Sequence, residues 1–309
     1  MPIYKRALVT GGAGFIGGHL AHALVAEGLT VTCLDNLVMG KRENVPPQAR
    51  LVEGDVRDRD LTKKLAAEAD IVFHEAAVVA IRTSMEGFYN DADTNIMGAL
   101  SMLDACKGSP VRKFLFASSM AVYGESTAAM TEDYEIAPIS PYGISKLAGE
   151  KYVLNICRTL GIDSVVLRYF NAYGTKQTFT PYVGVITIFI KKLLAGEPIT
   201  IFGAGEQTRD YVSVRDLIQA NLLAMNKDVN GEIFNVASGV TRSVNEIAEM
   251  LIDELAPGVV PGYEPSQPGE IFRSEPDITK ARTVLGYEPA GDLKRDIKEI
   301  IDWHRSLRP

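Results

Sequence analysis

The chain has 309 residues, of which 46% are hydrophobic, and its formal net charge is -7 at pH 7. A chain of this length and composition can bury a large core, in one domain or in two unequal ones. The negative net charge argues against nonspecific nucleic-acid binding. No apolar run reaches transmembrane length and no signal segment precedes the first predicted strand, so we expect a cytoplasmic protein that does not insert into membranes.

The glycines near the N-terminus follow a strand and begin a helix. An apolar strand is predicted over 6–10, glycines occupy positions 11, 14 and 17, and a helical pattern runs from Phe15 to Glu27. In this spacing Gly11 permits a tight turn, Gly14 lets the backbone approach a pyrophosphate, and Gly17 lets helix and strand pack closely. The helix amides would face the anion. The pattern therefore predicts a dinucleotide site.

Asp35 ends the second predicted strand, over 30–34, and indicates which dinucleotide is bound. A carboxylate there accepts hydrogen bonds from both ribose hydroxyls and repels a 2′-phosphate, which favours NAD over NADP. Two alternatives stay open at this stage. The Asp35-Asn36 pair is also common in turns, and Lys41-Arg42 could recruit a phosphate.

Short β-rich segments alternate with helical patterns through the first 170 residues, and this alternation predicts a doubly wound parallel sheet. Polar and small residues follow the third and fourth strands, at the sheet edge where ligands bind: Asp55 in one turn, Ala76 and Ala77 in the other. Simple strand-to-helix packing would equally explain the two alanines. The six strands are expected near 6–10, 30–34, 50–53, 70–74, 112–118 and 163–169.

A smaller α/β lobe is predicted after residue 170. A helix is expected over about 184–195, a strand over 199–202, and terminal helices over 278–285 and 292–306. A helix over 209–225 and a strand over 231–236 would rejoin the first domain. We therefore expect a dinucleotide domain of residues 1–170 plus about 210–237, and a substrate lobe of about 171–209 plus 238–309.

The three cysteines lie in separate apolar segments, at positions 33, 106 and 157, without the spacing of metal ligands. We expect small core residues, with neither a disulfide nor a metal site.

A single Tyr-x-x-x-Lys pair, Tyr142 and Lys146, begins the helical pattern over 141–159, downstream of Ser119 at the end of the fifth strand. A spacing of four puts both side chains on one helix face, near the sheet edge that holds Ser119. Oxidation of an alcohol needs a base at the hydroxyl, and Tyr142 is the candidate. A lysine ammonium about 5 Å away contributes roughly 3 kcal/mol, lowering the tyrosine pKa by about 2 units. Ser119 would hold the reacting oxygen.

The ordered motifs resemble those of the extended short-chain dehydrogenase/reductase family, and within it the nucleotide-sugar 4-epimerases of the UDP-glucose/UDP-N-acetylglucosamine type. The resemblance covers essentially the whole chain. It rests on Thr10–Gly17, Asp35-Asn36, Gly54-Asp55, Asn95, Ser119, Tyr142 with Lys146, Arg168–Gly174 and Gly203–Val212.

The resemblance implies a homodimer that binds NAD and a UDP-sugar. Hydride would leave sugar C4, and the 4-keto sugar would rotate and be reduced on its other face. Asp55 would approach the adenine, and Asn171 and Arg209 the pyrophosphate. Without the resemblance, Asn171 would be expected in a turn and Arg209 in a surface ion pair with Glu206 or Asp210. The implied cofactor residues are Gly11, Gly14, Phe15, Ile16, Gly17, Asp35, Asn36, Asp55, Val56, Ala76, Ala77, Asn95, Tyr142 and Lys146.

Reaction and substrate are further narrowed by comparison with that family. Met120 and Ala121 stand where related dehydratases and decarboxylases carry acids, and neither side chain transfers a proton, so epimerisation is expected. The position that often selects the sugar corresponds to Ser274, which would admit N-acetylhexosamines as well as hexoses. The alternative is that Ser274 merely caps a turn.

Two residues depart from the family pattern. Gln267 replaces an arginine that grips the pyrophosphate in many relatives, and Glu75 is an unusual acid after the strand-end His74. A different oxidoreductase or epimerase on a sugar nucleotide therefore stays open, as does a non-catalytic NAD-binding protein.

Overall fold

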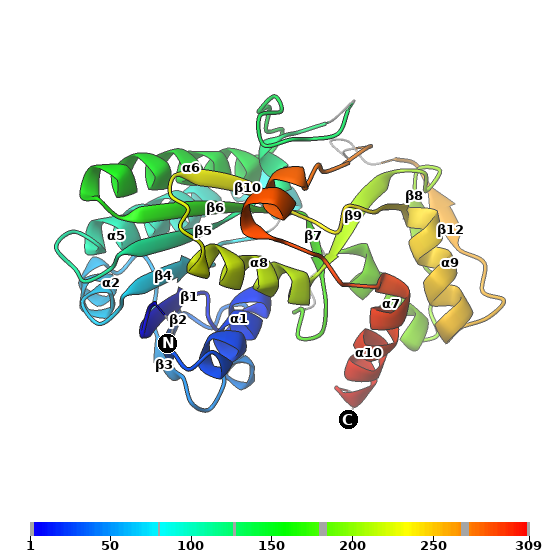
Figure 1. The fold of residues 1–309 in the computed structure, drawn as a ribbon. Helices are drawn as coiled ribbons and strands as arrows, with labels where there is room; N and C mark the ends of the chain where they lie inside the picture. The colour runs from blue at the N-terminus through cyan, green and yellow to red at the C-terminus, as the bar shows by residue number, and fades with distance from the viewer. Residues whose placement is uncertain (1–2, 80, 126–127, 179–183, 267–271, 308–309) are drawn as a thin grey trace.

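A seven-stranded parallel sheet forms the centre of the computed structural model, which describes residues 3–79, 81–125, 128–178, 184–266 and 272–307. Figure 1 shows the sheet with helices packed around it. The strands, in spatial order, are β10 (Glu232–Val236), β6 (Asp163–Tyr169), β5 (Lys113–Ser119), β4 (Ile71–His74), β1 (Arg6–Thr10), β2 (Thr30–Asp35) and β3 (Arg50–Glu53).

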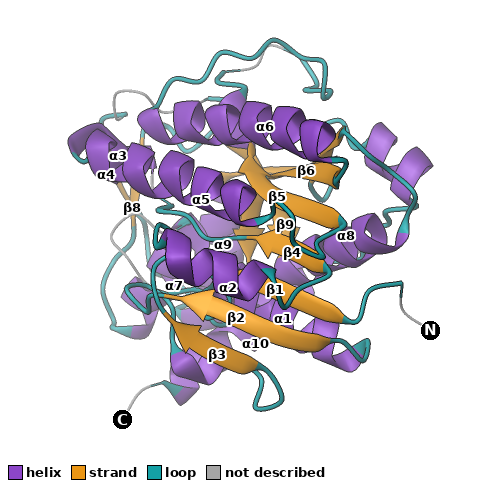
Figure 2. Ribbon diagram, turned by 90° about the vertical axis from the view of Figure 1, so that its left-hand side faces the viewer, coloured by secondary structure: helices purple, strands orange, loops and turns teal. Residues whose placement is uncertain are grey.

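Helices cover both faces of this sheet, because the central strands are apolar on both sides. One face packs against α1 (Phe15–Ala26) and α8 (Val214–Asn226). The other packs against α2 (Arg59–Ala66), α5 (Gly98–Ala105) and α6 (Pro141–Leu160), which lie in front of the sheet in Figure 2. The predicted doubly wound parallel sheet is confirmed.

The strand order reverses between β1 and β4. From β1 the chain continues outward through β2 and β3, and then returns to β4 on the other side of β1. In such sheets ligands bind outside the carboxyl ends of the strands at this reversal. The glycine-rich turn after β1 and the segment after β4 therefore lie side by side at the expected binding edge.

Helix α6 carries the Tyr-x-x-x-Lys pair, and local signals set its limits. The Ser140 hydroxyl accepts a hydrogen bond from the Gly143 amide at 3.1 Å, and Pro141 occupies the first turn. Gly161 ends the helix in the left-handed region, with φ 68°. Tyr142 consequently lies in the first turn, close to the end of β5.

Short helical segments fill the connections around the sheet. They are η1 (Arg42–Asn44), α3 (Ile81–Glu86), α4 (Phe88–Ala92), the π-helical turn η2 (Asp93–Met97), η3 (Met120–Val122) and the π-helical turn η4 (Ala281–Leu285).

The remaining elements gather around a separate apolar cluster on the other side of the molecule (Figure 1). They form a three-stranded sheet, a two-stranded sheet and three helices. These are β11 (Thr241–Ser243), β9 (Thr208–Ser213) and β7 (Asn171–Tyr173); β12 (Gly262–Glu264) and β8 (Thr200–Phe202); and α7 (Val185–Leu194), α9 (Val244–Leu255) and α10 (Leu293–Ser306).

Two features of this part differ from the sequence analysis. The predicted helix over 209–225 begins only at Val214, because residues 208–213 pair with β7 and β11 as strand β9. Helix α9 was not predicted, although Ser243 and Glu246 form a capping box at its start. No helix in the described ranges is long and apolar enough to cross a membrane.

Candidate active site

Gly11 and Gly17, in the glycine-rich turn, leave no room for a side chain. Gly11 has φ 68°, and a Cβ there would lie 2.9 Å from the backbone of Ala76. A Cβ on Gly17 would lie 2.1 Å from the Gly11 carbonyl oxygen. Gly14 precedes α1 without any side-chain cap, so the first amides of the helix stay available to an anion. Phe15 and Ile16 are half-buried in the first turn of α1. The turn has the shape that a pyrophosphate cradle needs.

Asp35 lies at the end of β2, beside this turn. Its carboxylate accepts hydrogen bonds from the Ala13 amide at 2.9 Å and from the Leu37 amide at 2.8 Å. The second bond is the turn interaction weighed in the sequence analysis, and the first ties the carboxylate to the glycine-rich loop. Each carboxylate oxygen can accept more than one hydrogen bond, so the turn role and ribose binding are compatible.

Asp55 and Asn36 meet where β2 and β3 end, since the Asn36 amide nitrogen lies 3.3 Å from the Asp55 carboxylate. Arg57 holds Asp55 at 2.7 Å and also reaches Asp93 at 2.5 Å. Hydrogen bonds from Arg57 keep the pKa of Asp55 far below its usual range. The Asp55 carboxylate at this end of the expected binding edge is therefore fixed and ionised, and the neighbouring Val56 is buried.

Asn95 fixes the segment after β4 that contains the half-buried Ala76 and Ala77. Its side-chain oxygen accepts from the Val78 amide at 2.8 Å, and its side-chain nitrogen lies 3.2 Å from the Val78 carbonyl oxygen. The same nitrogen is 3.1 Å from the Ser145 hydroxyl on α6. Asn95 thus positions the segment after β4 relative to α6.

Ser119, Tyr142 and Lys146 come together at the end of β5. Ser119 is the last residue of that strand, and its side chain hydrogen-bonds to Tyr142. The Lys146 ammonium lies 6.0 Å from the centre of the Tyr142 ring and donates to the Ala117 carbonyl at 2.9 Å. Tyr142 and Lys146 are both buried. The structure therefore brings the three predicted catalytic residues together.

The electrostatics of this triad differ from the expectation for Tyr142. Burial, with a smaller contribution from the nearby carboxyls of Asp91 and Glu75, raises the pKa of Tyr142 to about 12, although the Ser119 hydrogen bond opposes the shift. Burial also lowers the pKa of Lys146 to about 8. The prediction that Lys146 would lower the tyrosine pKa by about 2 units is wrong in this respect, because it left out the desolvation of both groups.

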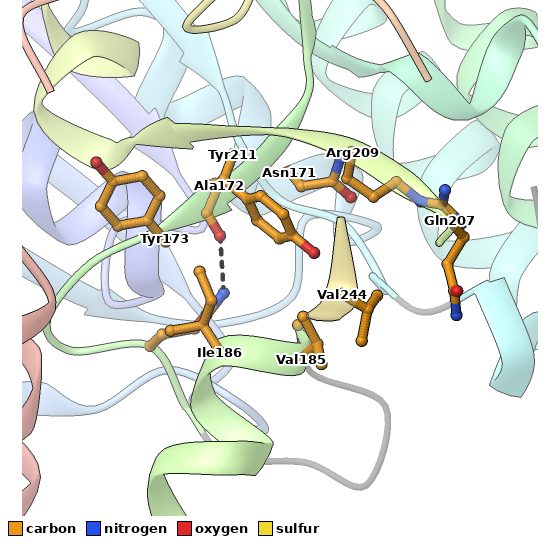
Figure 3. A pocket seen from close by; sticks show the side chains of 11 residues that line it. Asn171, Ala172, Tyr173, Val185, Ile186, Gln207, Arg209, Tyr211 and Val244 are labelled. Atoms are coloured by element: carbon orange, nitrogen blue, oxygen red, sulfur yellow. Dashed lines mark hydrogen bonds between the residues drawn. The ribbon is translucent and has the colours of Figure 1, made fainter. Parts of the chain in front are cut away.

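A pocket of about 150 Å³ lies between strands β7 and β9 and the start of α7 (Figure 3). Asn171 and Arg209 both line it. Asn171 lies two residues beyond Tyr169, which is in register with Ser119. The Arg209 guanidinium lies 2.8 Å from the Thr208 carbonyl oxygen. The Asp210 carboxylate, one of the two alternative ion-pair partners of Arg209, accepts hydrogen bonds from residues 238–240.

Ser274 is fully buried in the segment that follows 272–273, and its hydroxyl oxygen has no hydrogen-bond partner among the described residues. Buried hydroxyls are normally paired, so this oxygen is a candidate ligand contact. Ser274 is not among the residues that line the pocket in Figure 3. Gln267 and the Gly-acidic pair at 269–270 lie outside the described residues.

Sequence reasoning missed much of the pocket wall. Tyr173, Gln177, Val185, Ile186, Gln207, Tyr211 and Val244 all line it. The strand pattern of 208–213 was the available signal, because it alternates Arg209 and Tyr211 on one side. Within the described ranges no group of three or more His, Cys, Asp or Glu side chains is placed to hold a metal ion, and the three cysteines are buried and unpaired.

Comparison with known proteins identifies the family. The model of the "NAD dependent epimerase/dehydratase family" matches residues 7–237. A putative UDP-glucose 4-epimerase of Methanocaldococcus jannaschii is 40% identical, over 97% of this chain and 98% of the relative. A UDP-N-acetyl-alpha-D-glucosaminuronate decarboxylase of Bacillus cytotoxicus is 34% identical over 98% of both chains.

Solved structures agree with this. UDP-glucose 4-epimerase from Thermotoga maritima, solved with UDP-glucose, has a TM-score of 0.94 at 37% identity, covering 98% of this chain and 99% of that one. UDP-N-acetylglucosamine 4-epimerase from Methanobrevibacter ruminantium has a TM-score of 0.94 at 34% identity over the full length of both. The Thermus thermophilus UDP-glucose 4-epimerase, solved with NAD, has a TM-score of 0.91 at 34% identity, covering 98% and 100%.

The glycine-rich turn fits the cofactor of these proteins, since a Cβ on Gly11 or Gly17 would clash with backbone atoms and the Asp35 carboxylate is hydrogen-bonded to the turn. Its cofactor is NAD. The chain belongs to the NAD-dependent epimerase/dehydratase family, within the extended short-chain dehydrogenases/reductases.

Proposed function

We propose that this protein is an NAD-dependent UDP-sugar 4-epimerase that interconverts UDP-glucose and UDP-galactose, and also the corresponding N-acetylhexosamine derivatives. The observation that carries the proposal is the Ser119–Tyr142–Lys146 group at the end of β5, in a chain that also has a glycine-rich dinucleotide turn and a pocket lined by Asn171 and Arg209. In this proposal, residues 1–170 plus about 210–237 hold NAD. Residues of about 171–209 plus 238–309 hold the nucleotide sugar.

Ser119 would bind the C4 hydroxyl of the sugar, and Tyr142 would transfer its proton. Ser119 would donate to the sugar oxygen, and Tyr142 would remove the hydroxyl proton and later return it to the same oxygen, once hydride has been added to the other face of C4. When bound, NAD supplies the acceptor and donor of the C4 hydride. Lys146 is held by the Ala117 carbonyl, which directs its ammonium toward the space between α6 and β5.

The residues after Ser119 favour epimerisation over related reactions. Met120 and Ala121 are both buried apolar residues. They cannot transfer the additional proton that elimination of water requires. One relative is a decarboxylase, so decarboxylation is the competing reaction. Analysis of the products distinguishes it from epimerisation.

Sugar selectivity would depend on Ser274, whose small side chain leaves space for an N-acetyl group. The unpartnered, buried hydroxyl supports this assignment, since a bound sugar would provide the missing hydrogen bond. Asn171 and Arg209 would bind the pyrophosphate, and the guanidinium fork suits that anion.

A homodimer is part of the proposal. Helices α4, η2 and α6 expose several large apolar side chains that a second copy could cover. These are Phe88, Tyr89, Met97, Ile144 and Tyr152. Sedimentation equilibrium of the purified protein tests this directly, and a monomer at micromolar concentration would contradict it.

The activity is tested by incubating the purified protein separately with UDP-glucose and UDP-N-acetylglucosamine, without added reductant, while NMR follows the sugar C1 and C4 protons. We expect both galacto products. Tyr142→Phe should lower the rate at least about 100-fold, because it removes the acid/base group. Conversion of neither sugar with NAD present would refute the UDP-hexose assignment, and release of carbon dioxide or loss of water would assign a different reaction.

A further inference from the structure

Glu75 is a half-buried carboxyl at the point where the strand order reverses. It follows β4 directly, and its amide donates to the Thr10 carbonyl of β1 at 3.2 Å. A Cβ on Gly11 would lie 3.0 Å from the carbonyl carbon of Glu75. The Glu75 backbone therefore packs against the dinucleotide turn, at the edge where the cofactor binds.

Its side chain lies near the catalytic residues, because its charge acts on both Tyr142 and Lys146. The Tyr169 hydroxyl donates to the Glu75 carboxyl at 3.0 Å, and the Asn221 side-chain nitrogen donates to the same hydroxyl at 2.7 Å. Tyr169 is in register with Ser119 across β5 and β6. The hydrogen-bonded chain Asn221–Tyr169–Glu75 thus holds a carboxyl beside the end of β5.

No ion pair balances this carboxyl within the described part of the chain. The Lys146 ammonium donates a hydrogen bond to the Ala117 carbonyl, and its Coulomb attraction to the Glu75 carboxylate lowers the pKa of Glu75. Tyr169 is the side chain that hydrogen-bonds to it, and it is a neutral phenol. A half-buried carboxylate with only these partners is costly, and added positive charge nearby would stabilise it.

The other titratable groups around Glu75 do not supply that charge. Burial lowers the pKa of the preceding His74 to about 3, so this imidazole stays neutral. Burial raises the pKa of both Tyr169 and Tyr142. Asp91, which acts on the same tyrosine and lysine, is itself an acid. Burial accordingly raises the pKa of Glu75 to about 7.

We propose that Glu75 is the counter-charge of the redox centre: its carboxylate stabilises the cationic, oxidised nicotinamide relative to the neutral, reduced form. The proposal rests on the proposed function for its consequence in turnover. Oxidation of the sugar carbinol breaks its C4–H and O–H bonds; two electrons and one proton leave as hydride, and the other proton goes to Tyr142. The positive charge of the nicotinamide disappears in that step. The Glu75 carboxylate therefore favours return of the hydride to the keto sugar and disfavours accumulation of the reduced cofactor.

The test is an equilibrium redox titration of the protein with its bound cofactor, against a dye couple of known potential and without any sugar nucleotide. The reduced fraction is read from the near-ultraviolet absorbance of the reduced nicotinamide. At about pH 8, where most of the Glu75 carboxyl is ionised, Glu75→Gln should raise the equilibrium constant for reduction at least about tenfold, a shift of about 30 mV for a two-electron couple.

The matched control is Asp104→Asn, which removes an exposed carboxylate on α5 that pairs with Arg59 and Lys107. It should leave the constant within about twofold of the wild type, because an exposed charge that is distant from the site is screened. Glu75→Asp, which keeps the charge, should stay closer to the wild type than Glu75→Gln does. Equal constants for wild type and Glu75→Gln would overturn the proposal and leave Glu75 as a hydrogen-bond partner of Tyr169.

A second measurement needs only the wild-type protein. Reduction by hydride takes up one proton, so the reduction constant should change about tenfold per pH unit if no other group titrates with it. Near the pKa of Glu75 the wild type should exceed this slope, because reduction also promotes proton uptake by the carboxyl. If the reduction constant of the wild type changes only tenfold per pH unit near the pKa of Glu75, the proposal is overturned. This result does not depend on whether the Glu75→Gln variant binds its cofactor. Absence of epimerisation together with the predicted shift would refute the proposed function alone, because the titration contains no sugar.

Discussion

Arg168 and Glu150 form a fully buried bidentate ion pair, in which Nε lies 2.8 Å from Oε1 and Nη2 lies 2.8 Å from Oε2. Glu150 is one helical turn beyond Lys146 on α6, and it also accepts a hydrogen bond from Ser118 at 2.5 Å. The pair therefore ties α6 to β6 and β5, immediately below the three catalytic candidates. It orients Tyr142 and Lys146 relative to the end of β5.

Arg168→Met should destabilise the protein by about 3–5 kcal/mol, because it leaves the buried Glu150 carboxylate without its partner. Glu150→Leu combined with Arg168→Met should cost less than Arg168→Met alone, since no uncompensated charge remains. Urea denaturation of both variants measures the difference. A double variant that is less stable than the single one would contradict this account of the pair.

The stability of the protein should depend on pH through Lys146. Burial lowers its pKa from 10.5 to about 8 in the folded protein. Between these two values the unfolded chain binds a proton that the folded protein has released, so folding stability rises with pH in that window. Relative to Lys146→Met, the wild type should therefore gain about 3 kcal/mol from about pH 8 to above pH 10. Denaturation at several pH values checks this, and a constant difference would contradict it.

Gly17→Ala should weaken NAD binding more than tenfold, because its Cβ would lie 2.1 Å from the Gly11 carbonyl oxygen and displace the turn. Gly262→Ala is the matched control, since the nearest atom to its Cβ is 3.8 Å away. The NAD content after purification and titration of the apoprotein with NAD provide the measurement. Equal affinity in the two variants would show that the turn does not hold the cofactor.

Arg209→Met should raise the KM for UDP-glucose about 10- to 100-fold with a smaller effect on kcat, because a charge-assisted contact to phosphate contributes about 1.5–3 kcal/mol. Arg305, an exposed arginine of α10 that pairs with Asp302, serves as the control position. Its change to Met should leave both constants unaltered. A fall in kcat alone for Arg209→Met would place Arg209 outside the substrate site.

Two variants of Ser274 separate a substrate contact from a packing role. Ser274→Ala should not reduce stability, because the hydroxyl it removes has no partner in the described structure, but should raise the KM for the sugar nucleotide. Ser274→Tyr should lower kcat/KM for UDP-N-acetylglucosamine far more than for UDP-glucose. Thermal denaturation and kinetics on both sugars provide the data, and an equal loss on both sugars would argue for packing alone.

Much of the fold followed from local pattern. The strand alternation predicted the parallel sheet, and the limits expected near 6–10, 50–53 and 163–169 agree with β1, β3 and β6. The four-residue spacing of Tyr142 and Lys146 placed them on one helix face. Such features depend on near neighbours in the chain, which is why periodicity and turn chemistry predict them.

The tertiary structure decided the remaining features, because they join residues that are distant in the chain. Residues 208–213 form a strand because they pair with β7 and β11, which are distant from them in the sequence. Glu75 meets Tyr169 across 94 positions of the sequence. Burial then set the direction of the Tyr142 pKa shift, since desolvation depends on everything packed around the phenol rather than on the nearest lysine. The sequence by itself determined which chemical groups are present and their local spacing, while folding determined their surroundings and therefore their charge states.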